Sequence, residues 1–325
     1  MSVHRPPFDP EIAAAMADNA DTLVVSMTPD QLGKVRARST VPAERWAAAT
    51  AGCVVTEHRV PGPAGDVRVL LLRPDGVVGP VPLLLHLHGG GLLSGSAQGD
   101  VDMLREVAPG WAVASVEYRL APEHPWPAAV EDALAALAWV VAHATDLGVD
   151  ASRVVVTGVS AGGGLAAALA LLVRDRDGPD LLGQLLVCPM LDDRNDTASA
   201  HQMQGVGAWD RVANATGWAA YLGDDAGGPA TPGHASPARA ASLRGLPPTF
   251  VDVGSAETFR DECVAYAARL WAEGEDAELH VWPGGCHGFD ALAPAARLSR
   301  AARAARAGWL ERLLASTPST SGAPR

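Results

Sequence analysis

Residues 154–164 read Val-Val-Val-Thr-Gly-Val-Ser-Ala-Gly-Gly-Gly, and this stretch decides how the chain is expected to fold. The β-branched residues predict a short strand, and the alanine- and leucine-rich residues after them predict a helix over about 161–174. The G-x-S-x-G pattern between them needs its glycines, because side chains would collide in so tight a turn. The turn places Ser160 at the start of the helix, where the helix dipole stabilises negative charge.

A phosphate-binding glycine loop is the other structure that such a turn can form. The chain has no G-x-x-x-x-G-K-[ST] motif to favour nucleotide binding. We therefore predict that Ser160 is a nucleophile and that the N–H of Ala161 helps to stabilise an oxyanion.

Seven further segments of mainly apolar residues predict strands on either side of this one. The first two flank a Pro-Gly-Pro-Ala-Gly turn and predict an antiparallel hairpin, whereas the later ones alternate with helical segments. That alternation is typical of a mostly parallel sheet buried on both faces. We expect an α/β fold with a mostly parallel, eight-stranded sheet flanked by helices. The seven segments are 54–60, 67–72, 81–87, 112–116, 182–187, 249–253 and 277–281.

Two segments depart from this alternation and are expected to form a helical cap. Residues 1–50 have helical patterns, and residues 191–235 are first polar and then rich in Trp and Gly, as an inserted lid would be. The polar start at 192–196 is expected to make capping and turn contacts. The α/β core is then predicted over 51–190 and 236–315, with a small, polar, disordered tail over 316–325.

A glycine loop follows the strand predicted at 81–87, where residues 88–91 read His-Gly-Gly-Gly. Glycines let the backbone N–H groups approach a substrate closely, and such donors stabilise the oxyanion formed when an ester carbonyl is attacked. His86 and His88 could instead be metal ligands, but two ligands are too few and no third is indicated. We expect His88 to brace the glycine loop by hydrogen bonding.

The general base and the acid should follow late strands, in the chain order serine, acid, histidine. His287 lies between small residues after the last predicted strand, and this position predicts the base. Glu257 lies in the loop after the strand at 249–253 and is predicted to orient the imidazole. Asp252, within that strand, and Asp261, one turn into the next helix, are the competing acids.

Four motifs together resemble the bacterial hormone-sensitive-lipase-like esterases: residues 88–91, 118–125 (Tyr-Arg-Leu-Ala-Pro-Glu-His-Pro), 158–163 and 287–289 (His-Gly-Phe). The resemblance covers about residues 40–315. It implies an α/β-hydrolase core with a cap, and esterase activity on short acyl chains without a metal or cofactor. It also implies Gly90, Gly91 and Ala161 as the oxyanion donors.

Two positions depart from the family pattern. The residue before the nucleophile is commonly Asp in the family and is Val159 here, which leaves the turn intact and puts the substrate in question. The family acid is usually the first Asp of a D-P-L-R-D-E pattern. The corresponding residues 257–262 read Glu-Thr-Phe-Arg-Asp-Glu, which favours Glu257 over Asp261.

Five side chains are candidates for lining the substrate pocket: Leu92, Leu93, Val159, Met203 and Trp209. Leu92, Leu93 and Val159 flank the glycine loop and the nucleophile. Met203 and Trp209 lie in the expected cap insertion, where packing within the cap is the alternative role.

Composition limits the partners. The chain has 25 Lys and Arg against 37 Asp and Glu, a net charge of −12, which argues against nucleic acid and anionic membranes as partners. There is no apolar signal segment, and the four scattered cysteines are expected to be thiols in a reducing compartment, so a cytoplasmic protein is predicted. The resemblance suggests a homodimer through the edge strand near 278–282.

We therefore predict a serine ester hydrolase that acts on a small-molecule ester through an acyl-enzyme. An acyl hydrolase of lactones, amides or acetylated metabolites is one alternative. A non-catalytic receptor of the same fold is another, although such receptors usually lack a triad residue.

Overall fold

The computed structural model describes residues 4–316, in which eight strands form one sheet. The strands are β1 (Cys53–Gly62), β2 (Gly65–Pro74), β3 (Val81–Leu87), β4 (Ala112–Glu117), β5 (Val149–Val159), β6 (Gly183–Val187), β7 (Thr249–Gly254) and β8 (Ala277–Trp282). Their order is β1-β2-β4-β3-β5-β6-β7-β8. β1 and β2 form the predicted hairpin, β2 is antiparallel to β4, and the other neighbours are parallel. The expected eight-stranded, mostly parallel sheet is confirmed.

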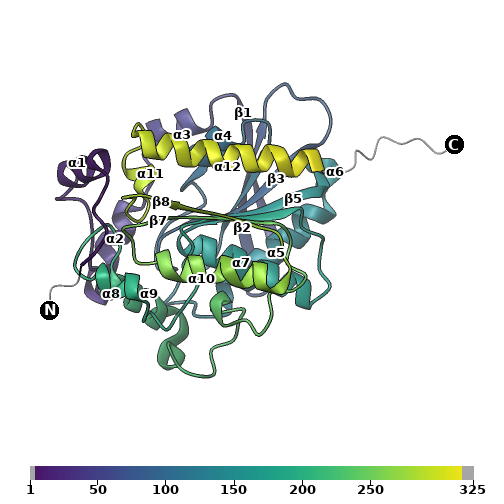
Figure 1. Ribbon diagram of the computed structural model, residues 1–325. Helices are drawn as coiled ribbons and strands as arrows, with labels where there is room; N and C mark the ends of the chain where they lie inside the picture. The colour runs from purple at the N-terminus through teal and green to yellow at the C-terminus, as the bar shows by residue number, and fades with distance from the viewer. Residues whose placement is uncertain (1–3, 317–325) are drawn as a thin grey trace.

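Helices cover both faces of this sheet. Figure 1 shows α12 and α4 over one face and α5, α7 and α10 over the other. Among the described residues, no helix combines the length and apolar character needed to cross a bilayer. The helices are α1 (Pro10–Asp18), η1 (Pro29–Gln31), α2 (Leu32–Arg38), α3 (Ala43–Ala49), α4 (Val101–Val107), α5 (Ala128–Ala142), α6 (Ala144–Leu147), α7 (Ala161–Asp175), α8 (Ala198–Gln202), α9 (Arg211–Leu222), η2 (Gly223–Asp225), η3 (Pro237–Arg239), α10 (Arg260–Glu273), α11 (Phe289–Leu292) and α12 (Arg297–Ser316).

The middle of the sheet forms the core because its strands are covered on both sides. Every residue of β3 is buried, and α7 is buried from Ala161 to Val173. This matches the near-continuous apolar runs that parallel strands require. The start of α7 is therefore fixed on all sides, which holds the turn before it in place.

The two segments predicted as a cap contact each other at one end of the sheet, where Figure 1 shows α1, α2, α8 and α9 gathered. Ser26 donates to a carboxylate oxygen of Asp210 at 2.6 Å, and Thr216 on α9 donates to the carbonyl oxygen of Met27 at 2.8 Å. At the other end of the chain, α12 includes Ser316, so the prediction of a disordered tail is wrong for this residue. Residues 317–325 lie outside the described part of the chain.

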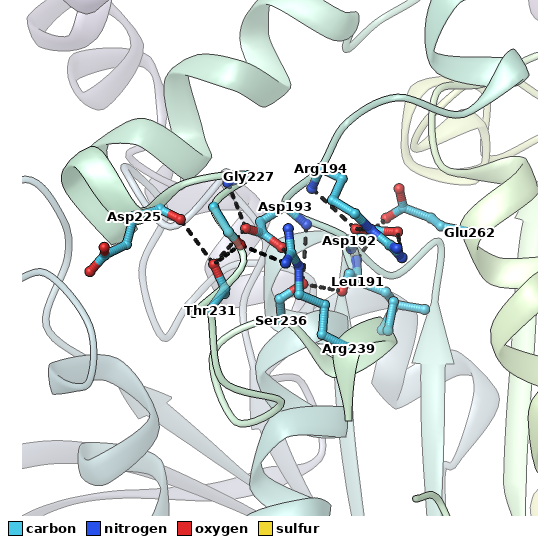
Figure 2. A network of polar contacts seen from close by, with 12 residues as sticks. Leu191, Asp192, Asp193, Arg194, Asp225, Gly227, Thr231, Ser236, Arg239 and Glu262 are labelled. Atoms are coloured by element: carbon cyan, nitrogen blue, oxygen red, sulfur yellow. Dashed lines mark hydrogen bonds and ion pairs between the residues drawn. The ribbon is translucent and has the colours of Figure 1, made fainter. Parts of the chain in front are cut away.

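A buried polar network holds the segment that leaves β6, as Figure 2 shows. The Asp193 side chain has no exposed surface, and its Oδ1 lies 2.5 Å from Nε of Arg239. Its Oδ2 accepts from the N–H of Gly227 at 2.7 Å and from the hydroxyl of Thr231 at 2.9 Å. Asp192 pairs with Arg194 at 2.6 Å. The polar run at 192–196 thus makes the turn contacts expected of it.

We expect Asp193→Asn to lower the free energy of unfolding by about 3 kcal/mol, because it leaves the Arg239 guanidinium without its carboxylate in a mostly buried place. Urea unfolding measures this loss. Glu11→Gln is the control, since it breaks an exposed ion pair with Arg297 and should leave the midpoint unchanged. A midpoint for Asp193→Asn equal to that of the control would contradict the importance of this ion pair.

Candidate active site

Ser160 lies in the turn between β5 and α7, as predicted. Its φ is +58°, in the left-handed region that residues with a side chain rarely adopt. A Cβ on Gly158 would lie 2.1 Å from the carbonyl oxygen of Gly162, and a Cβ on Gly162 would lie 2.0 Å from that of Leu87. The turn therefore packs directly against the end of β3, and no residue but glycine fits at either flanking position.

The structure brings Ser160, His287 and Glu257 together. Nε2 of His287 lies 2.9 Å from Oγ of Ser160, and Nδ1 lies 3.0 Å from Oε1 of Glu257. The second carboxylate oxygen of Glu257 accepts from the N–H of Gly254 at 3.0 Å, and the ring of Phe259 packs edge-on against the imidazole. The Glu257 side chain has no exposed surface, whereas 12% of the His287 side chain is exposed. This is the geometry of a nucleophile, a base and an orienting acid.

The two competing acids are engaged elsewhere. The carboxylate of Asp252 accepts from Trp282 at 3.0 Å and from the buried guanidinium of Arg306 at 2.9 Å. Asp261 accepts from the N–H of Ser199 at 2.7 Å and pairs with Arg260. Of the three carboxylates considered from the sequence, Glu257 is the one that hydrogen-bonds to the imidazole of His287.

The glycine loop after β3 presents unused backbone donors. Gly90 has φ +124° and Gly91 has φ +65°, and among the described residues neither N–H donates to a protein acceptor. Ala161 is the first residue of α7, where helical N–H groups have no intrahelical partner. The predicted oxyanion donors are thus free to bind an oxygen beside Ser160.

His88 braces this loop, in agreement with the expectation. Its Nδ1 lies 2.9 Å from the carbonyl oxygen of Gly89, and its ring stacks on Tyr118 at 4.1 Å between centroids. The hydroxyl of Tyr118 donates to the carbonyl oxygen of His88 at 2.7 Å. Burial lowers the pKa of His88 to about 4, so its ring is neutral at pH 7 and serves as a spacer and a hydrogen-bonding group.

The pocket candidates occupy different places. The ring of Trp209 covers the glycine loop, because a Cβ on Gly91 would lie 2.5 Å from it, and its centroid is 6.5 Å from that of His287. Leu93 lines a cavity of about 820 Å³ between α2 and α9, and Val159 lines one of about 240 Å³ beside α4. Leu92 and Met203 are buried and line neither cavity.

One group of possible metal ligands includes Glu257 and His287. The ligand atoms of Cys188, Glu257 and His287 lie within 4.8 Å of one another. In this structure the imidazole and the carboxylate bond each other, so a metal would have to displace that hydrogen bond to use Nδ1. His86, the other histidine considered as a ligand, has its Nδ1 2.8 Å from the hydroxyl of Ser115.

Two supporting residues were missed from the sequence. Arg36 on α2 donates to the carbonyl oxygens of Leu93 and Ala121 at 2.8 and 2.9 Å. Asp100 accepts from the N–H of Gly89 at 3.1 Å. Both hold the loop that carries the oxyanion donors, and neither belongs to a motif that spacing alone would reveal.

Comparison with known proteins agrees with the fold and this arrangement. A family described as alpha/beta hydrolase fold matches residues 84–291. The chain is similar to Esterase LipI of Mycobacterium tuberculosis, with 36% identity over 72% of this chain and 74% of that protein. It is also similar to the Carboxylic ester hydrolase LipN of the same organism, with 39% identity over 72% of this chain and 64% of LipN.

Solved structures extend the likeness over nearly the whole chain. A structure titled Bacterial Heroin Esterase is 37% identical with a TM-score of 0.85, covering 94% of this chain and 98% of the other. Esterase LipW from Mycobacterium marinum is 36% identical with a TM-score of 0.84, covering 97% and 99%. The chain therefore belongs to the alpha/beta-hydrolase-fold family, and within it to the bacterial hormone-sensitive-lipase-like esterases.

Proposed function

We propose that this protein hydrolyses carboxylic esters with short acyl chains through an acyl-enzyme on Ser160. Membership of the family supports ester hydrolysis. One observation supports the roles proposed for Ser160, His287 and Glu257. The imidazole of His287 bridges the hydroxyl of Ser160 and the buried carboxylate of Glu257, at 2.9 and 3.0 Å. A non-catalytic receptor would not need all three groups in hydrogen-bonding contact.

The proposed reaction has two steps. Nε2 of His287 takes the proton of Ser160 as the hydroxyl attacks the ester carbonyl, and the N–H groups of Gly90, Gly91 and Ala161 stabilise the oxyanion. His287 then protonates the leaving alcohol. Water, deprotonated by the same nitrogen, attacks the acyl-enzyme and releases the acid. Glu257 keeps Nδ1 protonated and stabilises the imidazolium.

The short-chain preference is proposed from the position of Trp209. Its ring lies against Gly91, within the loop that would bind the ester carbonyl, and its centroid is 6.5 Å from that of His287. A rigid indole so close to the reacting atoms limits the space for a long acyl chain. Leu93 and Val159 are proposed as further pocket residues, because each lines a cavity.

We also propose that the N-terminal segment up to residue 50 and residues 191–235 form a cap over a core of residues 51–190 and 236–315. The hydrogen bonds of Asp210 and Thr216 to the N-terminal segment support this grouping. A cytoplasmic location is supported by the four cysteines, all of which are free thiols. A homodimer is proposed through β8, because this edge strand leaves one side of its backbone for a second copy.

The acyl-enzyme predicts a burst of p-nitrophenol when the protein is mixed with p-nitrophenyl acetate, followed by slower steady turnover. Ser160→Ala should abolish the burst and lower kcat by about 10⁴-fold or more, because the nucleophile is lost. Stopped-flow absorbance measures both phases. Absence of both burst and turnover with every short ester tried would rule out the esterase assignment.

Glu257→Ala should lower kcat by about 10³- to 10⁴-fold, because the imidazole loses the group that fixes its tautomer. Asp261→Ala is the matched control and should change kcat by less than about tenfold, since its carboxylate contacts Ser199 and Arg260 instead. Steady-state kinetics on p-nitrophenyl acetate compares the two variants. A large loss in Asp261→Ala alone would assign the acid to Asp261.

Trp209→Ala should move the preferred acyl length from two to four carbons towards eight or more, because it removes the ring over the glycine loop. The measurement is kcat/KM across p-nitrophenyl esters of increasing acyl length. Trp271→Ala, at an exposed tryptophan on α10, is the control and should leave the profile unchanged. An unchanged profile in Trp209→Ala would show that another wall sets the limit.

A further inference from the structure

A cavity of about 240 Å³ lies beside the triad, on the side of α3, α4 and α11. Its wall includes Val159, which precedes the nucleophile, and Gly288, which follows the base. Met103, Val187 and Pro294 add apolar surface. The residues that line the larger cavity between α2 and α9 are all different, so the two spaces are distinct.

Charged groups also line this cavity, and most of them are paired. Asp102 binds Arg45 at 2.7 Å, and Glu106 pairs with Arg303. Asp290 is paired as well, since it binds the buried guanidinium of Arg306 at 2.5 Å. Three of the four carboxylates in the wall are thus neutralised by arginine.

Asp100 is the fourth carboxylate, and no arginine or lysine among the described residues pairs with it. Its Oδ2 accepts from the N–H of Gly89 at 3.1 Å and lies 3.8 Å from Nε2 of His86. Burial opposes ionisation, but contacts with His86 and Gly89 hold the pKa of Asp100 below its ordinary value. About 24% of the side chain remains accessible, so a negative charge faces the cavity.

The Asp100 charge is close to the reacting serine. A Cβ built on Gly89 would lie 3.7 Å from Cβ of Ser160 and 3.8 Å from Oδ2 of Asp100, so both atoms lie within 4 Å of one point. Cβ of Ser160 and Oδ2 of Asp100 are therefore no more than 7.5 Å apart, a separation that an ester bound at Ser160 can span with a cationic group on its alcohol. In the proposed reaction the leaving alcohol faces His287, which protonates it. The residue after this histidine, Gly288, lines the cavity together with Ala291.

We propose that this cavity selects esters whose alcohol carries a cation, an ammonium group about two carbons from the ester oxygen, and that Asp100 is its counter-ion. The proposal rests on the proposed ester hydrolysis and names its substrate class. Val159 and the other apolar side chains of the wall suit the methyl or methylene groups of such an ammonium. The attraction between an ammonium and the Asp100 carboxylate is stronger in this cavity than in water, because the surrounding dielectric is lower.

The test compares two esters of the same shape. Acetylcholine and 3,3-dimethylbutyl acetate differ in that a positively charged nitrogen replaces a neutral carbon. We expect kcat/KM for acetylcholine to exceed that for the neutral ester by about tenfold or more in the unmodified protein. Asp100→Asn keeps an oxygen that can accept from the N–H of Gly89. In this variant the kcat/KM values for the two esters should differ by less than about twofold.

Two controls separate the carboxylate's charge from other effects. Asp146→Asn, at an exposed position on α6, removes the same charge elsewhere and should leave the ratio unchanged. If Asp100→Asn lowers kcat/KM equally for both esters, the inference fails, because the carboxylate would then only support the loop. If the preference for acetylcholine persists in Asp100→Asn, the inference also fails, because the net charge of the protein would then cause the preference.

A measurement on the unmodified protein keeps the inference testable if Asp100→Asn does not fold. Choline should inhibit hydrolysis of the neutral ester competitively, and 3,3-dimethylbutanol should inhibit at least about tenfold more weakly. Equal inhibition would overturn the inference. If hydrolysis of the neutral ester requires Ser160 but the protein shows no preference for the cationic ester, the proposed function stands and the inferred substrate class is wrong.

Discussion

The start of α7 lies against the end of β3 so closely that no side chain fits between them, and the rest of the active site depends on this contact. The carbonyl oxygens of Leu87 and His88 would lie 2.0 and 2.4 Å from a Cβ on Gly162. Glycine at this position lets the nucleophile turn and the oxyanion loop occupy neighbouring space. Ser160, in this turn, has a strained backbone with a φ of +58°, and burial of α7 holds the strain in place.

The triad adds a second constraint, which is electrostatic. Glu257 is buried, and no arginine or lysine within residues 4–316 pairs with it; its carboxylate is stabilised by the N–H of Gly254 and by the imidazole of His287. A buried carboxylate is costly unless its oxygens are hydrogen-bonded, and here each oxygen has a partner. Glu257 is longer than the family's usual Asp, yet both hydrogen bonds of the imidazole have ordinary lengths.

The residues around the triad are proposed to bind the ester, whereas the triad is proposed to cleave it. Asp100, the residue before α4, and Arg36 on α2 both hold the glycine loop. Trp209 lies over the loop, and the small cavity lies past Val159 and Gly288. The proposed reacting groups lie in the proposed core, and so do Asp100 and Val159, whereas Trp209 lies in the proposed cap insertion. Under this proposal, substitution of Asp100 or Trp209 changes selectivity while the turn and the triad remain.

The sequence alone predicted the succession of strands and helices along the chain and the roles of Ser160 and His287, because these predictions depend on local patterns. Valine-rich segments, a glycine turn and a histidine after the last strand each act over a few neighbouring residues. Tertiary structure decided which carboxylate meets His287, since Asp252 is taken by Arg306 from a helix far along the chain. It also decided that Asp100 lines a cavity with no arginine partner in the described part of the chain. Such pairings depend on packing between distant segments, which local spacing does not encode.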